Sequence, residues 1–212
     1  ALSSAASDVY KRQQRYFEEE ISNEVNLSYS DNQVTVTTDY LTLVYTLNSE
    51  GYASQCVYSL SSQNRIYQFS YSAEGYLTGI VENIDDTEYS STSLTYENGD
   101  ITSISSKMNG LENKFIYEPG EESSTYHLPC LGLLEIHPLT FHIEALYAGL
   151  LGKDPRHFTM HSCPAGSNDE KTVYSYGFDK KGNPSRMICQ TTYAGGQASY
   201  YPYTRNISIS FE

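Results

Sequence analysis

The stretch RIYQFSYSAEGYLTGIVENI, residues 65–84, decides the fold of this chain. Aromatic residues alternate with polar ones as far as Tyr71, Ser72-Ala73-Glu74-Gly75 follows, and apolar residues return from Leu77. Alternation of period two on both sides of a short polar segment is typical of a β-hairpin. A small polar residue first and a glycine fourth suit a type I turn closed at positive φ, which glycine adopts at low cost. The stretch therefore predicts two antiparallel strands joined by a tight turn.

The same unit recurs along the chain. Gly51, Gly75 and Gly99 are each 24 residues apart, and a fixed period of that length indicates repeated supersecondary units. Residues 179–182 repeat the turn spacing near the C-terminus, while Asn98-Gly99 is the shorter type I′ form. We therefore expect a meander of hairpins with Gly51, Gly75 and Gly182 at positive φ.

Composition agrees with an all-β fold. The 212 residues include 21 tyrosines, no tryptophan and 39% hydrophobic residues, and aromatic and β-branched side chains favour strands. This length can bury the core of one domain. Apolar residues gather on one face of the predicted strands and Ser, Thr and Gln on the other, so we expect a sheet that is buried on one side.

The first residues stand apart from the repeats. We expect residues 1–22 to be a tail and residues 23–212 to be a single β-meander domain. Residues 1–13 resemble a translated adapter read-through, which would mean that the true N-terminus is missing. The alternative is a short natural helix that reaches Glu20.

One segment breaks the strand pattern and predicts a helix over about residues 138–151. Pro138 suits its first turn and Gly152 its end. One face of this helix is apolar and a second face is made of alanine and glycine, so we expect the helix to be buried against the concave side of the sheet. The apolar stripe and the small face supply the candidate ligand-binding residues, which are Leu139, Ile143, Leu146, Gly149 and Leu150.

Two groups of motifs carry a resemblance to known proteins. The hairpins at residues 71–80 and 96–104 are similar to YD repeats. The run Leu146-Tyr147-Ala148-Gly149-Leu150-Leu151-Gly152-Lys153, placed before one closing hairpin, resembles a Bacteroidales family of secreted or lipid-anchored proteins, a domain of unknown function with a porin-like fold. The resemblance covers about residues 23–212. It implies a strongly curved, barrel-like antiparallel meander with one helix inside or across it, a location in the cell envelope (periplasmic or outer-membrane lipoprotein) or outside the cell, and lipid binding in some members.

The charge of the chain limits its partners. A formal net charge of −13 repels phosphate backbones and anionic headgroups, so nucleic acid is not an expected partner. No apolar run is long enough to span a membrane as a helix. The family resemblance implies that a lipid anchor could be attached to the missing N-terminus.

The histidines and two cysteines are the residues that we weighed as a metal site. His157, His161 and Cys163 could offer nitrogen and sulfur to zinc, but their spacing lacks the paired signature of structural sites, so we expect no metal and no cofactor. Cys130 and Cys163 could instead form a disulfide in an exported protein. The histidine-rich span also contains His127, His137 and His142.

No motif for catalysis is present. The sequence contains no Gly-x-Ser-x-Gly elbow and no phosphate-binding glycine loop. The acid pairs Asp85-Asp86 and Glu121-Glu122 fit solvated turns better than calcium or glycosidase chemistry. We therefore expect a protein that is not an enzyme.

Two functions remain from the sequence. The first is a binder that holds a lipid or another apolar molecule between the helix and the curved sheet, a usual position for a pocket in such folds. The alternative is a surface interaction or scaffold module whose interior is filled by its own side chains.

Overall fold

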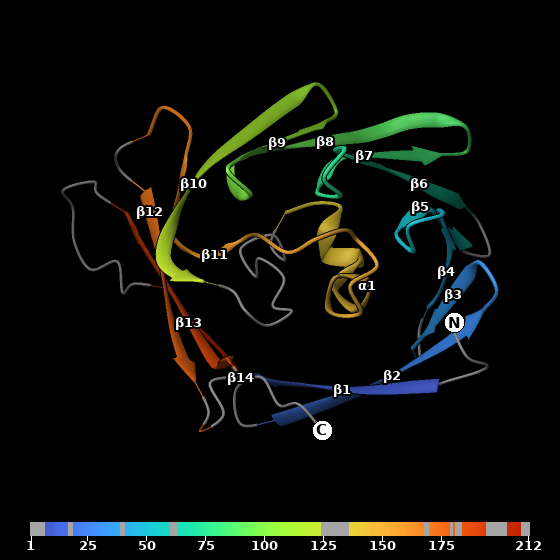
Figure 1. Ribbon diagram of the computed structural model, residues 1–212, viewed down its shortest axis with the longest axis horizontal. Helices are drawn as coiled ribbons and strands as arrows, with labels where there is room; N and C mark the ends of the chain where they lie inside the picture. Colours follow the sequence, from blue (N-terminus) through green and yellow to red (C-terminus); the bar gives the residue numbers. More distant parts are fainter. Residues whose placement is uncertain are drawn as a thin grey trace. The chain divides into compact units, whose positions relative to one another are not determined.

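The fold is all-β, as predicted, and its strands follow one another in the sheet in sequence order (Figure 1). The computed structural model describes residues 7–16, 19–38, 41–59, 63–123, 136–167, 170–178, 180, 184–193 and 203–208. Every ladder with a defined register is antiparallel. Among these residues no ladder joins the last strand to the first, so closure of the meander into a barrel stays a prediction. The strands are β1 (Ser7–Tyr16), β2 (Glu19–Ser30), β3 (Gln33–Thr37), β4 (Thr42–Leu47), β5 (Ala53–Ser59), β6 (Asn64–Tyr71), β7 (Leu77–Ile84), β8 (Thr87–Glu97), β9 (Asp100–Met108), β10 (Leu111–Ser123), β11 (His157–Pro164), β12 (Glu170–Phe178), β13 (Pro184–Tyr193) and β14 (Tyr203–Ser208).

The turns of the repeat have the predicted conformation. Gly51 has φ 86° and Gly75 has φ 92°, and each glycine N–H donates to the carbonyl three residues earlier, at 3.1 and 3.0 Å. Asn98 and Gly99 both have positive φ, as a type I′ turn requires. The prediction is therefore confirmed at Gly51 and Gly75, while Gly182 lies outside the described residues.

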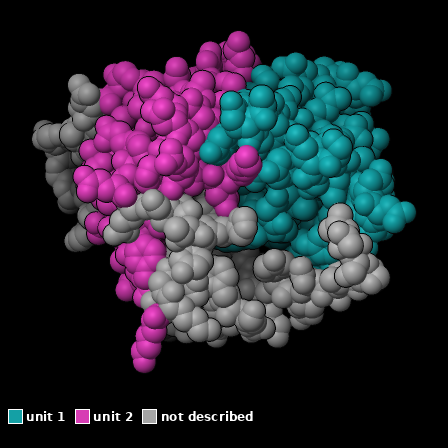
Figure 2. Space-filling view, viewed as in Figure 1, with its two compact units in different colours: residues 1–91, 141–152 teal, residues 92–140, 153–212 magenta. Residues whose placement is uncertain are grey.

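Contact density divides the chain into two compact units (Figure 2). Unit 1 contains Ala1–Ser91 and Phe141–Gly152, and unit 2 contains Thr92–Thr140 and Lys153–Glu212. Strand β8 contributes residues to both. Each unit is described separately below.

The first described residues form a strand. Strand β1 pairs with β2 from Ser7↔Ser28 to Tyr16↔Glu19, which differs from the short helix offered as an alternative for this segment. The edge of β2 provides hydrogen-bonding partners for the backbone N–H and C=O groups of β1, which would be unpaired in an isolated strand. This pairing extends the meander in the N-terminal direction.

In unit 1 the buried face of the sheet contains one continuous cross-strand row. Each member lies opposite the next across a ladder: Tyr29, Val34, Tyr45, Cys56, Tyr67 and Glu82. Glu82 joins this row because of a β-bulge, since Tyr71 pairs with Leu77 but Ser70 pairs with Gly79, and Thr78 is the extra residue. A bulge reverses the alternation that follows it. Ile80 and Glu82 therefore face the interior, where an unbroken strand would have placed Val81.

Unit 2 has a core of its own. Two sets of polar contacts lie beside this core. The Asp100 carboxylate accepts a hydrogen bond from the His157 backbone N–H and contacts His157 Nδ1, both at 2.8 Å. The His137 carbonyl accepts hydrogen bonds from the Thr92 and Ser106 hydroxyls, both at 3.1 Å. The buried apolar side chains include Leu94, Ile101, Ile104, Tyr117, Phe158, Tyr174, Met187 and Cys189.

The predicted helix is present but much shorter than residues 138–151. A 3₁₀ turn, η2 (Leu139–Phe141), precedes α1 (Ile143–Tyr147), and α1 is the α-helix of the described chain. Gly149, with φ 70°, ends it, because the N–H of Leu150 bonds the Ala145 carbonyl and that of Gly149 bonds the Leu146 carbonyl. This is a Schellman ending. The expected helical face of Ala145, Gly149 and Gly152 therefore does not exist, since the last two residues lie beyond the helix. None of the described helices has the length and hydrophobicity needed to cross a membrane.

Candidate functional site

His142 attaches the start of the helical segment, by which we mean residues 139–152, to the sheet of unit 1. It immediately precedes α1, its side chain is fully buried, and a hydrogen bond of 2.8 Å joins its Nδ1 to the Tyr45 hydroxyl. The imidazole stands edge-on to Tyr67 at 4.4 Å between ring centroids and to Phe69 at 5.3 Å. Edge-to-face packing of this kind adds to the energy of burial. The ring thus occupies the space between the segment and strands β4 and β6.

The end of the segment is fastened through its backbone. The Leu150 carbonyl accepts a hydrogen bond from the Ala53 N–H at 2.7 Å, and the Tyr71 hydroxyl bonds the carbonyls of Ala53 at 2.6 Å and Leu150 at 3.4 Å. Burial raises the pKa of Tyr71, so its hydroxyl stays protonated and can donate. The segment is therefore connected to β5 and β6 by direct bonds.

At Gly152 the segment lies so near the sheet that a side chain has no room. A Cβ added there would lie 2.7 Å from the Gly75 carbonyl oxygen, 3.1 Å from a Tyr71 ring carbon and 3.2 Å from the Leu77 nitrogen. Only a residue without a side chain fits at this position. At this end the gap between segment and sheet is thus closed by backbone contact.

The predicted ligand-binding residues differ in their exposure to solvent. Leu139, Leu146 and Leu150 are buried, and Ile143 is partly exposed. Gly149 is exposed, and a Cβ added there would meet no atom within 4 Å. These residues therefore do not line one common surface.

The charged end of the cross-strand row was missed by sequence reasoning. Glu82 is completely buried, its Oε1 lies 3.0 Å from Arg65 Nη1, and its Oε2 accepts the Ser90 hydroxyl at 2.8 Å. Burial, followed by the Glu82 charge, raises the pKa of the adjacent Tyr67. The polar signal available in the sequence was Arg65, which lies opposite Ile84 in the β6–β7 ladder and reaches Glu82 diagonally. Because both carboxylate oxygens have partners, this group is suited to holding β6, β7 and β8 together.

Comparison with known proteins identifies the family. The family model described as "Domain of unknown function (DUF4595) with porin-like fold" matches residues 4–186. The chain belongs to this family. The predicted resemblance to a porin-like domain of unknown function is thereby confirmed.

Two solved structures resemble this DUF4595 chain. A porin-like protein from Bacteroides uniformis ATCC 8492 superposes with a TM-score of 0.82 and 26% sequence identity, covering 97% of this chain and 84% of that one. A porin-like protein from Bacteroides vulgatus ATCC 8482 has a TM-score of 0.57 and 12% identity, covering 95% and 93%, and it shows the fold alone. No curated protein matches the sequence.

The histidines of the DUF4595 chain have separate partners. His142 bonds Tyr45, His157 pairs with Asp100, and His161 Nδ1 lies 3.2 Å from Glu118 Oε2. Within the described residues no three His, Cys, Asp or Glu side chains lie close enough to hold a metal ion. The span that looked like one cluster in the sequence is therefore distributed over several pairs, and His127 lies outside the described residues.

The predicted disulfide is not formed in this structure. Cys163 is a free thiol, and so are the buried Cys56 and Cys189. Cys130, the partner expected for Cys163, lies outside the described residues. Burial raises the pKa of Cys56 to about 12, which keeps it a neutral core side chain at physiological pH.

Proposed function

We propose that this chain is a non-enzymatic module of the cell envelope or cell surface that acts as a scaffold with a filled helix–sheet contact. The observation that supports this proposal is the packing of the helical segment against the sheet in unit 1. The His142 ring occupies one end of that contact, and backbone touches backbone at Gly152. A contact filled in this way favours the scaffold alternative over a ligand between helix and sheet. The envelope location is supported by the likeness to a Bacteroides protein described as porin-like.

An apolar ligand is the second candidate, and one observation favours it. Phe141 is 37% exposed and Ile143 is partly exposed, so the residues on either side of His142 present apolar surface. A lipid chain could lie against these two residues without entering the filled contact. This site would replace the stripe that includes Gly149, because Gly149 faces open space.

Uptake of a fluorescent fatty acid distinguishes the two candidates. The scaffold proposal predicts no saturable uptake by the wild-type chain. The Phe141→Ser and Ile143→Ser variants provide the test of location, and Leu111→Ser, which changes a side chain that is 72% exposed on β10, is the matched control. Saturable uptake that both segment variants weaken and the control does not would overturn the scaffold proposal.

Two finer expectations belong to the same proposal. The barrel-like curvature predicts a compact particle in small-angle scattering, and an elongated profile would contradict it. The lipid anchor predicts that full-length protein from its source partitions into the detergent phase. Recovery of the protein wholly in the aqueous phase would exclude the anchor.

A further inference from the structure

A small pocket in unit 2 opens where two neighbouring strands separate. Strand β10 pairs with β11 from Phe115↔Pro164 to Glu118↔His161. On the other side of β11, the ladder to β12 contains His161↔Val173 and Ser162↔Thr172. Where β12 departs from β11, a pocket of ≈ 180 Å³ forms. A cavity of about 150 Å³ accepts benzene, so this pocket has room for a small organic group.

The pocket combines a thiol with a histidine whose ring is oriented. Cys163 and His161 both line it, and both are partly exposed. They are two positions apart on β11, so their side chains point to the same face of the sheet. The 3.2 Å contact between His161 Nδ1 and Glu118 Oε2 turns the other ring nitrogen, Nε2, away from Glu118. His161 lines the pocket, where an imidazole can act as a general base for a bound group.

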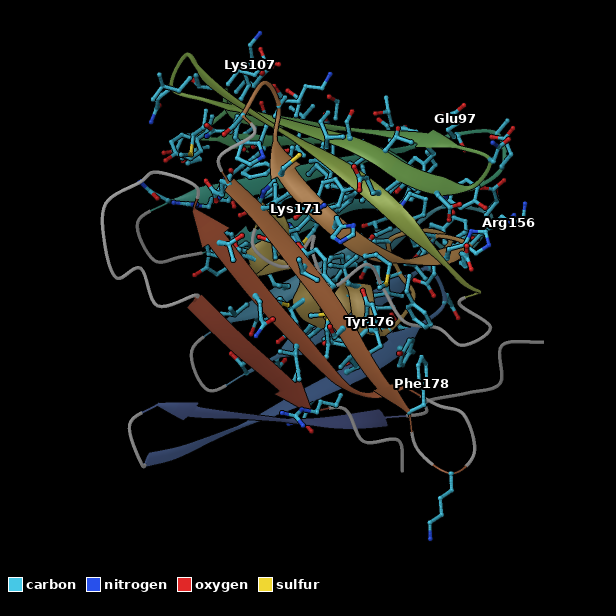
Figure 3. All side chains as sticks on the ribbon, turned by 90° about the vertical axis from the view of Figure 1, so that its left-hand side faces the viewer. Glu97, Lys107, Arg156, Lys171, Tyr176 and Phe178 are labelled. Atoms are coloured by element: carbon cyan, nitrogen blue, oxygen red, sulfur yellow. The ribbon has the colours of Figure 1, made fainter. Side chains whose placement is uncertain are left out.

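Residues of both charges line the pocket. Lys171 lies on β12, on the same strand as Tyr176 and Phe178 (Figure 3), and Lys171 and Glu170 both line the pocket. Ile116 lies directly opposite Cys163 across the β10–β11 ladder and gives the pocket an apolar wall. Glu118 on β10 and Lys171 on β12 flank β11, and both line the pocket. A carboxylate on one side of the pocket and an ammonium on the other complement a small zwitterion.

We propose that this pocket is a thiol-exchange site at which Cys163 forms a mixed disulfide with a small zwitterionic disulfide of the cystine class. His161 Nε2 accepts the thiol proton, and the Cys163 thiolate attacks one sulfur of the ligand disulfide. The ligand S–S bond breaks as the new S–S bond forms, and the departing thiolate recovers the proton from His161. Cys163 is oxidised and one ligand sulfur is reduced, so no further oxidant is needed.

The other described cysteines do not compete for this reaction. Cys56 and Cys189 are buried, and a thiol must be exposed to attack a disulfide. Among the cysteines that the structure describes, modification is therefore expected at Cys163 alone.

The first test is intact mass spectrometry of the full chain incubated with cystine at about pH 7.5, followed by peptide mapping. The expected product carries one added half-cystine on Cys163. Absence of the adduct, or an adduct found on another cysteine instead, would overturn the proposal. Circular dichroism before and after the reaction verifies that the chain stays folded.

The second test measures the rate of modification by cystine and by the uncharged 2-hydroxyethyl disulfide. His161→Ala is expected to slow both reactions about tenfold at pH 7. The difference from wild type should become smaller as pH rises, because hydroxide can then replace the missing base. Lys171→Ala should slow the cystine reaction alone. His157→Ala, a change of the same type on the same strand outside the pocket, is the control. Equal rates for His161→Ala and His157→Ala at pH 7, or equal slowing of both disulfides by Lys171→Ala, would contradict the assigned roles.

Discussion

Individual polar side chains in unit 1 are buried with their hydrogen-bonding partners. Glu82 meets Arg65 and Ser90, and His142 meets Tyr45. A buried polar group is costly without such partners, because it has lost its bonds to water. These contacts therefore specify which strands and which segment come together, in addition to the apolar burial that drives folding.

The bond between Tyr45 and His142 can be tested by removing one hydroxyl. Tyr45→Phe preserves the ring but deprives His142 Nδ1 of this 2.8 Å partner, so we expect a loss of about 1–3 kcal/mol in the free energy of unfolding. Urea unfolding measures this loss. Tyr58→Phe, on the partly exposed Tyr58 of β5, is the control and should change stability by less than about 0.5 kcal/mol. Equal losses in the two variants would show that the bond to His142 has no special weight.

At the scale of elements, the sequence predicted the hairpins well because their signals are local. Turn residues and alternation lie within a few positions of one another, and Gly51 and Gly75 have the expected φ. The β7 bulge was not predictable, because Thr78 carries no mark of being the extra residue and the shift depends on the neighbouring strand. Glu82 was consequently missed.

The helix shows a different limit of sequence reasoning. Apolar spacing over residues 138–151 resembled four turns, yet residues beyond Gly149 bond to the sheet instead of continuing the helix. Leu150 and Leu151 are buried all the same. Periodicity thus predicted which residues are buried but not the backbone conformation that buries them, because short helices depend on tertiary contacts.

Gly152 and Gly51 form a matched pair for testing the approach of the segment to the sheet. Both have a similar positive φ, 90° and 86°, so alanine at either position costs about 1–2 kcal/mol in backbone strain. At Gly51 the new Cβ meets nothing within 4 Å, but at Gly152 it lies 2.7 Å from the Gly75 carbonyl oxygen. Gly152→Ala should therefore lower the free energy of unfolding by about 1–3 kcal/mol more than Gly51→Ala does. Equal losses in urea unfolding would mean that the segment can move away at little cost.

The cross-strand row should make unit 1 sensitive to alkali. Burial raises the pKa of Cys56 from 9.0 to about 12, and it also raises the pKa values of Tyr45 and Tyr67. Between pH 9 and 12 the unfolded chain releases the thiol proton and the folded chain keeps it. The free energy of unfolding therefore falls as pH rises, by up to about 1.4 kcal/mol per pH unit for each such group.

Comparing wild type with Cys56→Ala isolates the contribution of this thiol. The variant is less stable at pH 8 because it loses packing, but its further loss between pH 8 and 10.5 should be smaller than that of wild type by about 2 kcal/mol. Parallel pH profiles in urea unfolding would mean that Cys56 ionises as readily in the folded chain as in the unfolded one.

For the whole molecule, charge determines which surfaces the chain can approach. Twenty-six acidic residues against thirteen Lys and Arg give −13 at neutral pH, and the sequence pI is ≈ 4.7. DNA and anionic vesicles should therefore repel the chain at pH 7, and added salt should screen the repulsion without producing binding. Below the pI the net charge becomes positive, so adsorption to DNA and to anionic vesicles should appear near pH 4 and weaken as salt is added.

Co-sedimentation with vesicles rich in phosphatidylserine, at pH 7 and pH 4 and at two salt concentrations, measures this adsorption, with neutral phosphatidylcholine vesicles as the control. Salt-sensitive binding to the anionic vesicles at pH 7 would contradict the prediction, because it would require a local basic surface that outweighs the net charge.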